Sequence, residues 1–215
     1  MSAPQLYLIT DRHATSGRPL PQVIDEALSG LGAGARVRVG VQLRDKDLSG
    51  AALYALAVEL RKVTRFHQAQ FFVNGRVDVA MACGADGVHL GAGSLPISVV
   101  KQLSAHLLVG VSTHAIDDVR QAGEEGADFV VFGPIFPTPS KQGILEARGL
   151  EALKSACTMG IPLVALGGID AASAAACCAA GAAGIAVIRA VLQAPLPGPA
   201  ARQLGDCFLR AHQAT

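Results

Sequence analysis

The sequence contains no tryptophan, and aromatic residues make up only 4% of the chain. Proteins that bind nucleic-acid bases by stacking need such side chains, so this class of function is disfavoured. The formal net charge is only +1, which argues against a broad basic surface for nucleic acid or an anionic membrane. No apolar run approaches the ~20 residues that cross a bilayer. The sequence therefore predicts no nucleic-acid partner and no membrane partner.

Disulfide and secretion signals are also missing. The five cysteines are odd in number and form no C-x-x-C pair, which is typical of buried thiols in a reducing compartment. The first residues, MSAPQLYLITDR, lack the charged and apolar regions of a signal peptide. We therefore expect a cytoplasmic protein with free thiols.

The chain does contain a regular alternation of short apolar runs with helical patterns. The apolar runs predict strands at 6–10, 38–43, 70–73, 87–90, 107–112, 129–132, 162–166 and 184–188. The helical patterns lie at 20–31, 49–66, 76–82, 96–105, 115–125, 150–159, 171–180 and 199–212. Runs such as LLVGVS and FVVFG are apolar throughout, as in a parallel sheet covered by helices. Eight such units predict an α/β fold, a (β/α)₈ TIM barrel that forms a single domain over residues 1–215.

A repeated helix-to-strand junction supports this cadence. It reads Gly84-Ala85-Asp86, Gly126-Ala127-Asp128 and Gly181-Ala182-Ala183, with glycine where each helix should end. An open doubly wound sheet is the competing architecture. It would normally carry G-x-G-x-x-G after its first strand, where this chain has Asp11-Arg12-His13. We therefore favour the barrel.

Polar residues that follow the strands are the candidate site residues, because barrel active sites lie at the carboxyl ends of the strands. After the second strand, alternation places Gln42, Arg44 and Lys46 on one side. Two cations and an amide suit a phosphate or a pyrophosphate. The alternative is a solvated strand end with ordinary surface ion pairs.

Other strand ends carry single polar side chains. Asn74 could hydrogen-bond a substrate, although Asn-Gly is also a common turn. Ser112 and His114 end the fifth strand, and His114 could act as an acid/base or fill a structural role. His89 lies inside the fourth strand, where a core histidine is expected.

Two loops complete the candidate site. The proline-rich segment 133–143 carries Thr138, Ser140 and Lys141, and it suggests either a lid that closes on an anion or a rigid loop. The seventh and eighth strands end in Gly167-Gly168 and Ile188-Arg189. Loops at these positions of a barrel commonly bind phosphate, although a tight turn alone would also use the glycines. The residues thus predict an enzyme that acts on a phosphorylated small molecule.

Several ordered motifs resemble one known family. YLITD, VQLRDK, FVNGRVDVA, GADGVHLG, GVSTH, FGPIFPTPSKQG, IPLVALGGI and AGAAGIAVI together are similar to the thiamine-phosphate synthase and thiazole tautomerase family over nearly the whole chain. The resemblance implies a (β/α)₈ barrel that takes part in thiamine biosynthesis. It implies that diphosphate or other substrate groups contact Gln42, Arg44, Lys46, Asn74, Ser112, Thr138, Ser140 and Lys141. It further implies that the thiazole phosphate contacts Gly167, Gly168, Ile188 and Arg189.

The sequence departs from the synthase pattern at the positions of two magnesium-binding aspartates. Gly75 and Ser94 stand there, and neither supplies the anionic oxygen that Mg²⁺ prefers. Arg189 also replaces a residue that is usually small in the family.

Because of these departures, we expect the tautomerase branch. Such an isomerase would move a proton on a carboxythiazole phosphate, with His114 as the catalytic acid/base and with no metal or other cofactor. The alternative is a thiamine-phosphate synthase, a transferase that joins hydroxymethylpyrimidine diphosphate to thiazole phosphate with Mg²⁺ and releases pyrophosphate. A third hypothesis is a non-catalytic, regulatory barrel that binds a phosphorylated ligand. The partners are thus a phosphorylated thiazole or a pyrimidine diphosphate, and the sequence leaves open whether the chain forms a homo-oligomer.

Overall fold

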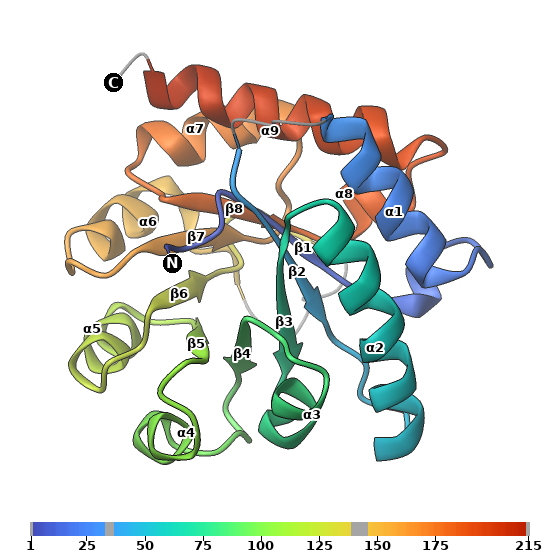
Figure 1. Ribbon diagram of the computed structural model, residues 1–215. Coiled ribbons are helices and arrows are strands. Elements are labelled where there is room, and N and C mark those ends of the chain that lie inside the picture. Colours follow the sequence, from blue (N-terminus) through green and yellow to red (C-terminus); the bar gives the residue numbers. More distant parts are fainter. Residues whose placement is uncertain (1, 33–36, 139–145, 214–215) are drawn as a thin grey trace.

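The computed structural model describes residues 2–32, 37–138 and 146–213 and forms a closed barrel of eight parallel strands (Figure 1). The strands are paired in chain order, and β1 also pairs with β8, which closes the ring. Their bounds are β1 Leu6–Ile9, β2 Val39–Leu43, β3 Gln70–Asn74, β4 Gly87–Leu90, β5 Leu108–Thr113, β6 Phe129–Phe132, β7 Leu163–Leu166 and β8 Gly184–Val187. The predicted TIM barrel is therefore confirmed, as a single domain.

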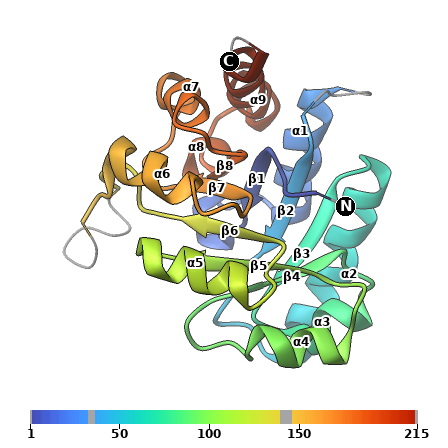
Figure 2. The ribbon, with the colours of Figure 1, turned by 90° about the vertical axis from the view of Figure 1, so that its left-hand side faces the viewer.

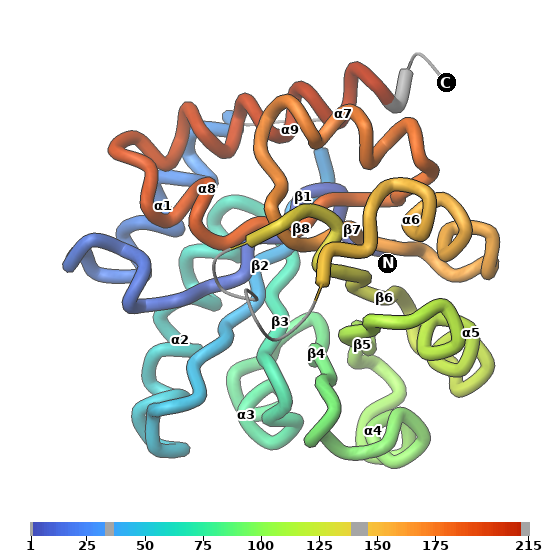
Figure 3. The backbone as a smooth tube through the Cα atoms, turned by 180° about the vertical axis from the view of Figure 1, so that it is seen from behind, coloured from blue at the N-terminus to red at the C-terminus, as the bar shows by residue number. Residues whose placement is uncertain are grey.

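Helices form a ring outside the strands (Figure 3). Their bounds are α1 Leu20–Leu31, α2 Gly50–Phe66, α3 Val77–Ala82, α4 Ile97–Leu103, α5 Ile116–Glu124, α6 Gly149–Cys157, α7 Ala171–Ala179, α8 Arg189–Leu192 and α9 Pro197–Gln213. The last helix, α9, packs across α7 and α1 (Figure 2). Within the described part of the chain, no helix has the length and apolar character needed to span a bilayer.

Two short elements were not predicted. The helix α8 and the 3₁₀ turn η1 (Arg12–Ala14) each contain about one helical turn, which is too short to show a periodic apolar pattern. Both follow a strand at the carboxyl end of the barrel. They therefore lie at the edge where a barrel active site is expected.

The aspartates of the repeated junction fasten the barrel from the opposite end. Asp86 accepts hydrogen bonds from the Phe71 backbone N–H at 2.8 Å and from both terminal nitrogens of Arg61. Asp128 accepts from the Val109 N–H at 2.7 Å and also pairs with a lysine. Each carboxylate thus ties the start of one strand to the neighbouring strand.

Aromatic rings fill the interior of the barrel. Tyr7, Phe72 and Phe129 are fully buried, and their ring centroids lie 5.3–5.7 Å apart in edge-to-face contacts. Three glycines on adjoining strands make room for these rings: Gly40, Gly87 and Gly110. A Cβ on any of them would press against one of the rings. The rings form a closed layer, and the candidate site lies beyond it, toward the carboxyl ends of the strands.

Candidate active site

Three predicted side chains project into the barrel above the aromatic layer. In a strand, side chains two residues apart share a face. Asn74 therefore shares the inner face of β3 with the buried ring of Phe72. Gln42 on β2 and Ser112 on β5 are also inward, because each hydrogen-bonds an interior ring. The structure thus brings together three neutral polar groups that the sequence placed on separate strands.

The Gln42 and Ser112 side chains are held from below. Gln42 Nε2 donates to Tyr7 Oη at 3.3 Å, and Ser112 Oγ lies 2.9 Å from His89 Nε2 in a hydrogen bond. Burial raises the pKa of Tyr7 well above its usual value. Burial, and secondarily the charge of Arg44, lowers the pKa of His89 to about 3. Both rings are therefore neutral near pH 7, and His89 is the core histidine that the sequence predicted.

The end of β2 supplies positive charge to the opening. Arg44 follows the strand, and its N–H donates to Thr10 Oγ1 at 2.9 Å. Arg44 lies two residues beyond Gln42 and so projects to the same inner side at the carboxyl end of the barrel, and its charge contributes to the lowered pKa of His89. Lys46 lies beyond the strand end, in a bend, and is exposed. The strand alternation that predicted one face for all three residues therefore governs Gln42 and Arg44, but not Lys46.

The two glycines after β7 lie against the loop that follows β6. Gly167 and Gly168 have φ angles of +101° and +64°, which disfavour other residues. Phe136 N–H donates to the Gly167 carbonyl at 3.0 Å, and a Cβ on Gly168 would lie 2.7 Å from Pro137 O. Loop packing thus requires the glycines here. The same packing places the backbone of this turn at the opening, where it could contact an anion.

The other described candidate residues lie in or after β5, β6 and β8, at the carboxyl end of the barrel. His114 Nδ1 lies 2.5 Å from the Gly133 carbonyl oxygen, and because that oxygen can only accept, Nδ1 carries the proton. Thr138 is half-buried in the loop after β6. Ile188 packs against the interior residues, whereas Arg189 begins α8 and is exposed. Ser140 and Lys141 lie outside the described residues.

The two positions that the resemblance assigns to magnesium ligands face one another. Gly75, in the turn after β3, has φ +69°, and a Cβ built there would lie 3.6 Å from Ser94 Oγ. Ser94 Oγ already accepts the Gly91 N–H at 2.9 Å. Neither position carries a carboxylate. Across residues 2–32, 37–138 and 146–213, no cluster of three or more histidine, cysteine, aspartate or glutamate side chains could hold a metal ion.

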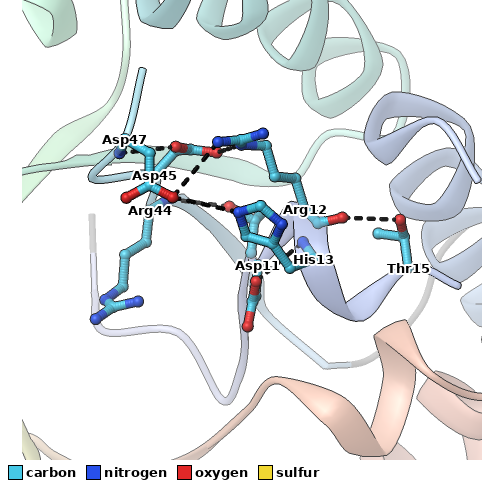
Figure 4. Close-up of polar contacts among 8 residues, drawn as sticks. Asp11, Arg12, His13, Thr15, Arg44, Asp45 and Asp47 are labelled. Carbon is cyan, nitrogen blue, oxygen red and sulfur yellow. Dashed lines mark hydrogen bonds and ion pairs between the residues drawn. The ribbon is translucent and has the colours of Figure 1, made fainter. Parts of the chain in front are cut away.

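Sequence reasoning missed a charged pair at the same edge. Arg12 in η1 binds Asp45, which stands between Arg44 and Lys46 in the chain (Figure 4). The partners are separated by 33 residues, so no local pattern indicates their contact. The alternation of cations and acids in 44–47 was the only indication in the sequence that these acids need a partner.

Comparisons with known proteins identify the family. A family model described as thiamine monophosphate synthase matches residues 6–191. Two relatives named thiamine-phosphate synthase come from Methanospirillum hungatei and Chloroflexus aurantiacus. The first is 39% identical and covers 96% of this chain and 98% of its own. The second is 42% identical, with coverages of 93% and 90%.

Solved structures agree. Thiamine phosphate pyrophosphorylase from Pyrococcus furiosus superposes with a TM-score of 0.83 at 35% identity, and the match covers 96% of both chains. A 3-hexulose-6-phosphate synthase has a TM-score of 0.68 at 21% identity over 94% of this chain and 99% of its own. This second likeness concerns the fold alone.

These findings overturn the tautomerase interpretation. The relatives carry the name of the synthase, which is a transferase, so the expected isomerase was wrong and the alternative is favoured. The acid/base role of His114 was predicted for the isomerase reaction and is not carried over. The wrong expectation was based on Gly75 and Ser94. The loss of two magnesium ligands changes how the charge of a diphosphate is neutralised, but it does not show whether the enzyme is a transferase or an isomerase. The chain belongs to the thiamine monophosphate synthase family.

Proposed function

We propose that this chain is a thiamine-phosphate synthase, which joins hydroxymethylpyrimidine diphosphate to thiazole phosphate and releases pyrophosphate. The observation that carries the proposal is an opening with two regions suited to anions. Arg44 and Lys46 follow β2, and the Gly167-Gly168 turn follows β7 near the start of α8 at Arg189. A reaction between two phosphorylated substrates needs two such regions. The names of the relatives support the same assignment.

The proposed reaction exchanges one bond for another at the pyrimidine methylene carbon. The carbon–oxygen bond to the diphosphate breaks, and pyrophosphate leaves with the electron pair. The thiazole nitrogen then gives its lone pair to the cation-like methylene and forms the carbon–nitrogen bond. Arg44 and Lys46 would stabilise the negative charge that grows on the leaving group. Gln42 and Asn74 would orient the diphosphate substrate by hydrogen bonds.

The layer below the site suits a positively charged intermediate. A protonated histidine at the position of His89 would repel the developing methylene cation. Burial instead keeps the imidazole neutral, with a pKa of about 3, and its bond to Ser112 fixes the hydroxyl that faces the substrate. The bond between Tyr7 and Gln42 fixes the amide in the same way. The floor of the site is thus polar and oriented, and it carries no charge.

The second substrate would occupy the opposite side of the opening. The backbone of Gly167, Gly168, Ile188 and Arg189 would hold the thiazole phosphate, and the Arg189 side chain is exposed where it could add a charged contact. The family resemblance also assigns substrate contacts to Thr138, Ser140 and Lys141. This assignment rests on position at the carboxyl ends of the strands and on the family pattern.

The residues present do not fit a magnesium ion held by the protein. Mg²⁺ prefers anionic oxygen ligands, whereas Gly75 has no side chain and Ser94 offers a neutral hydroxyl that is already bonded to a backbone N–H. In this chain, neutralisation of the diphosphate therefore falls to the cations that follow β2. No step of the proposed reaction is assigned to a metal.

The test is direct synthesis. Purified protein is incubated with hydroxymethylpyrimidine diphosphate and thiazole phosphate, with and without added Mg²⁺, and thiamine phosphate and pyrophosphate are quantified. We expect both products in equal amounts. Absence of thiamine phosphate under both conditions from folded protein would refute the proposal.

A matched pair of arginine variants links turnover to the opening. Arg44→Ala should lower kcat/KM about 10²-fold, a typical effect of removing one preorganised group that stabilises charge in the transition state. Arg120→Ala removes an exposed arginine from α5 that is paired with acids of its own helix, and it should leave turnover unchanged. Equal activity of the two variants would contradict the role of Arg44.

A further inference from the structure

The loop after β2 carries an acid that could neutralise the cations of the proposed anion site. Asp45 stands between Arg44 and Lys46 in the chain. A carboxylate at that position is the nearest competitor of a diphosphate for either cation. The behaviour of Asp45 therefore decides whether the two cations are available.

Asp45 is occupied by another residue. Arg12 Nε lies 2.5 Å from Asp45 Oδ2, and the Asp45 side chain is only 3% exposed. The other carboxylate oxygen, Oδ1, accepts the Asp47 N–H at 3.2 Å. The outer nitrogen of Arg12 reaches Asp47 at 3.4 Å, and His13 Nε2 reaches the same carboxylate at 3.2 Å. Both acids after β2 are thus engaged by residues after β1.

The backbone of η1 holds Arg12 in place for this contact. The Asp11 side chain accepts the His13 N–H at 3.0 Å and caps the turn. Thr15 Oγ1 lies 2.7 Å from the Arg18 carbonyl and 3.1 Å from the Arg12 carbonyl, and its one proton is shared between these two acceptors. Arg12 therefore projects from a turn that is fastened on both sides.

Arg44 and Asp45 point in opposite directions. Figure 4 shows the Arg44 guanidinium directed away from the group formed by Arg12, Asp45 and Asp47. Within residues 2–32, 37–138 and 146–213, neither Arg44 nor Lys46 forms an ion pair, whereas Arg12 forms one with each acid. Among the described residues, the two acids thus pair with Arg12, and Arg44 and Lys46 are left without an ion-pair partner.

We propose that Arg12 is a positioning residue that sequesters Asp45, so that Arg44 and Lys46 stay available for the diphosphate. The proposal rests on the proposed function, because that function supplies the diphosphate. Arg12 does not touch the substrate. It removes a carboxylate that would otherwise neutralise the site, and it fastens the loop after β2 to η1.

The experiment measures the affinity for inorganic pyrophosphate by calorimetry, without turnover. Arg12→Ala should weaken binding about tenfold or more, because the released carboxylate competes for the cations. Adding Asp45→Asn to that variant should restore the affinity to within about threefold, since the amide keeps the shape and loses the charge. Asp45→Asn alone should bind pyrophosphate no more weakly than wild type. Arg120→Ala is the matched surface control and should behave as wild type.

Three results would overturn the inference. Pyrophosphate binding could be absent from wild type, or unchanged in Arg12→Ala. The double variant could also bind as weakly as Arg12→Ala, which would mean that Arg12 itself contacts the anion or only supports the fold. Far-UV circular dichroism and thermal melting establish that each variant is folded. Should Arg12→Ala fail to fold, Arg12→Gln replaces it in the same pyrophosphate titration, with the same weakening and the same rescue by Asp45→Asn expected.

The outcome is separable from that of the proposed function. A protein that shows the rescue by Asp45→Asn but makes no thiamine phosphate would refute the synthase and keep the role of Arg12. If wild type makes thiamine phosphate but the Arg12→Ala variant binds pyrophosphate as tightly as wild type does, the synthase is kept and the role of Arg12 is refuted.

Discussion

Replacing His89 by glutamine tests whether burial keeps this imidazole neutral in the folded protein. The residue is 2% exposed, its ring lies beside Tyr7 and Phe129, and its Nε2 and Ser112 Oγ share a hydrogen bond of 2.9 Å. Glutamine retains a polar group that can reach the hydroxyl, but it takes up no proton near neutral pH. The comparison therefore isolates the cost of protonating the ring.

The magnitude follows from the lowered pKa of His89. The pKa falls from 6.5 to about 3 on folding, so the unfolded chain binds the proton more strongly between these values. The neutral ring therefore does not reduce the free energy of unfolding above pH 6.5. As the pH falls from 6.5 toward 3, the free energy of unfolding decreases by about 1.4 kcal/mol per pH unit. At about pH 5, the expected loss is on the order of 2 kcal/mol.

The assay is urea unfolding of wild type and His89→Gln at about pH 7.5 and about pH 5. Wild type should lose on the order of 2 kcal/mol more of its unfolding free energy than the variant over this interval. His106→Gln, at an exposed histidine, is the control and should follow wild type. Equal losses in wild type and His89→Gln would refute the argument that burial governs this ring.

Three further predictions concern the site and its support. Introducing aspartates at Gly75 and Ser94 together should raise the affinity for Mn²⁺, measured by electron paramagnetic resonance without substrate, by about tenfold or more; no gain would mean that the two positions do not form a cation site. Gly168→Ala, at φ +64° and with a Cβ 2.7 Å from a backbone oxygen of the neighbouring loop, should cost about 1–3 kcal/mol in thermal unfolding; an unchanged melting temperature would contradict this. Asp128→Ala should cost about 1–3 kcal/mol in urea, because a strand N–H and a lysine lose their acceptor, whereas the exposed Asp117→Ala should change stability little.

Most of the fold could be predicted because each strand contains a short run of mostly apolar residues. The structure places β6 at Phe129–Phe132, as expected, and α1 at Leu20–Leu31, as expected. Short elements such as η1 and α8 were not predicted, because a single turn carries no period. Asp11 caps η1, and the end of α8 is held by the distant Arg18, whose guanidinium donates to the Leu192 carbonyl at 3.1 Å.

The site could be predicted less completely, for physical reasons that differ by residue. Gln42 was predicted from strand alternation and Ser112 from its place at the end of a strand, and the structure places both inside the barrel. Lys46 lies past the strand end, where alternation no longer applies. The contact between Arg12 and Asp45 joins two loops far apart in sequence, and only the closed barrel brings them together.

The aromatic layer gives the barrel a solid floor. Tyr7, Phe72 and Phe129 are fully buried and pack edge to face across the interior of the barrel, below the carboxyl ends of the strands. Any molecule that enters above this floor must depart by the route through which it arrived. Both substrates and both products of the proposed reaction would pass through the same entrance. The order of binding and release would then depend on the loops that follow the strands.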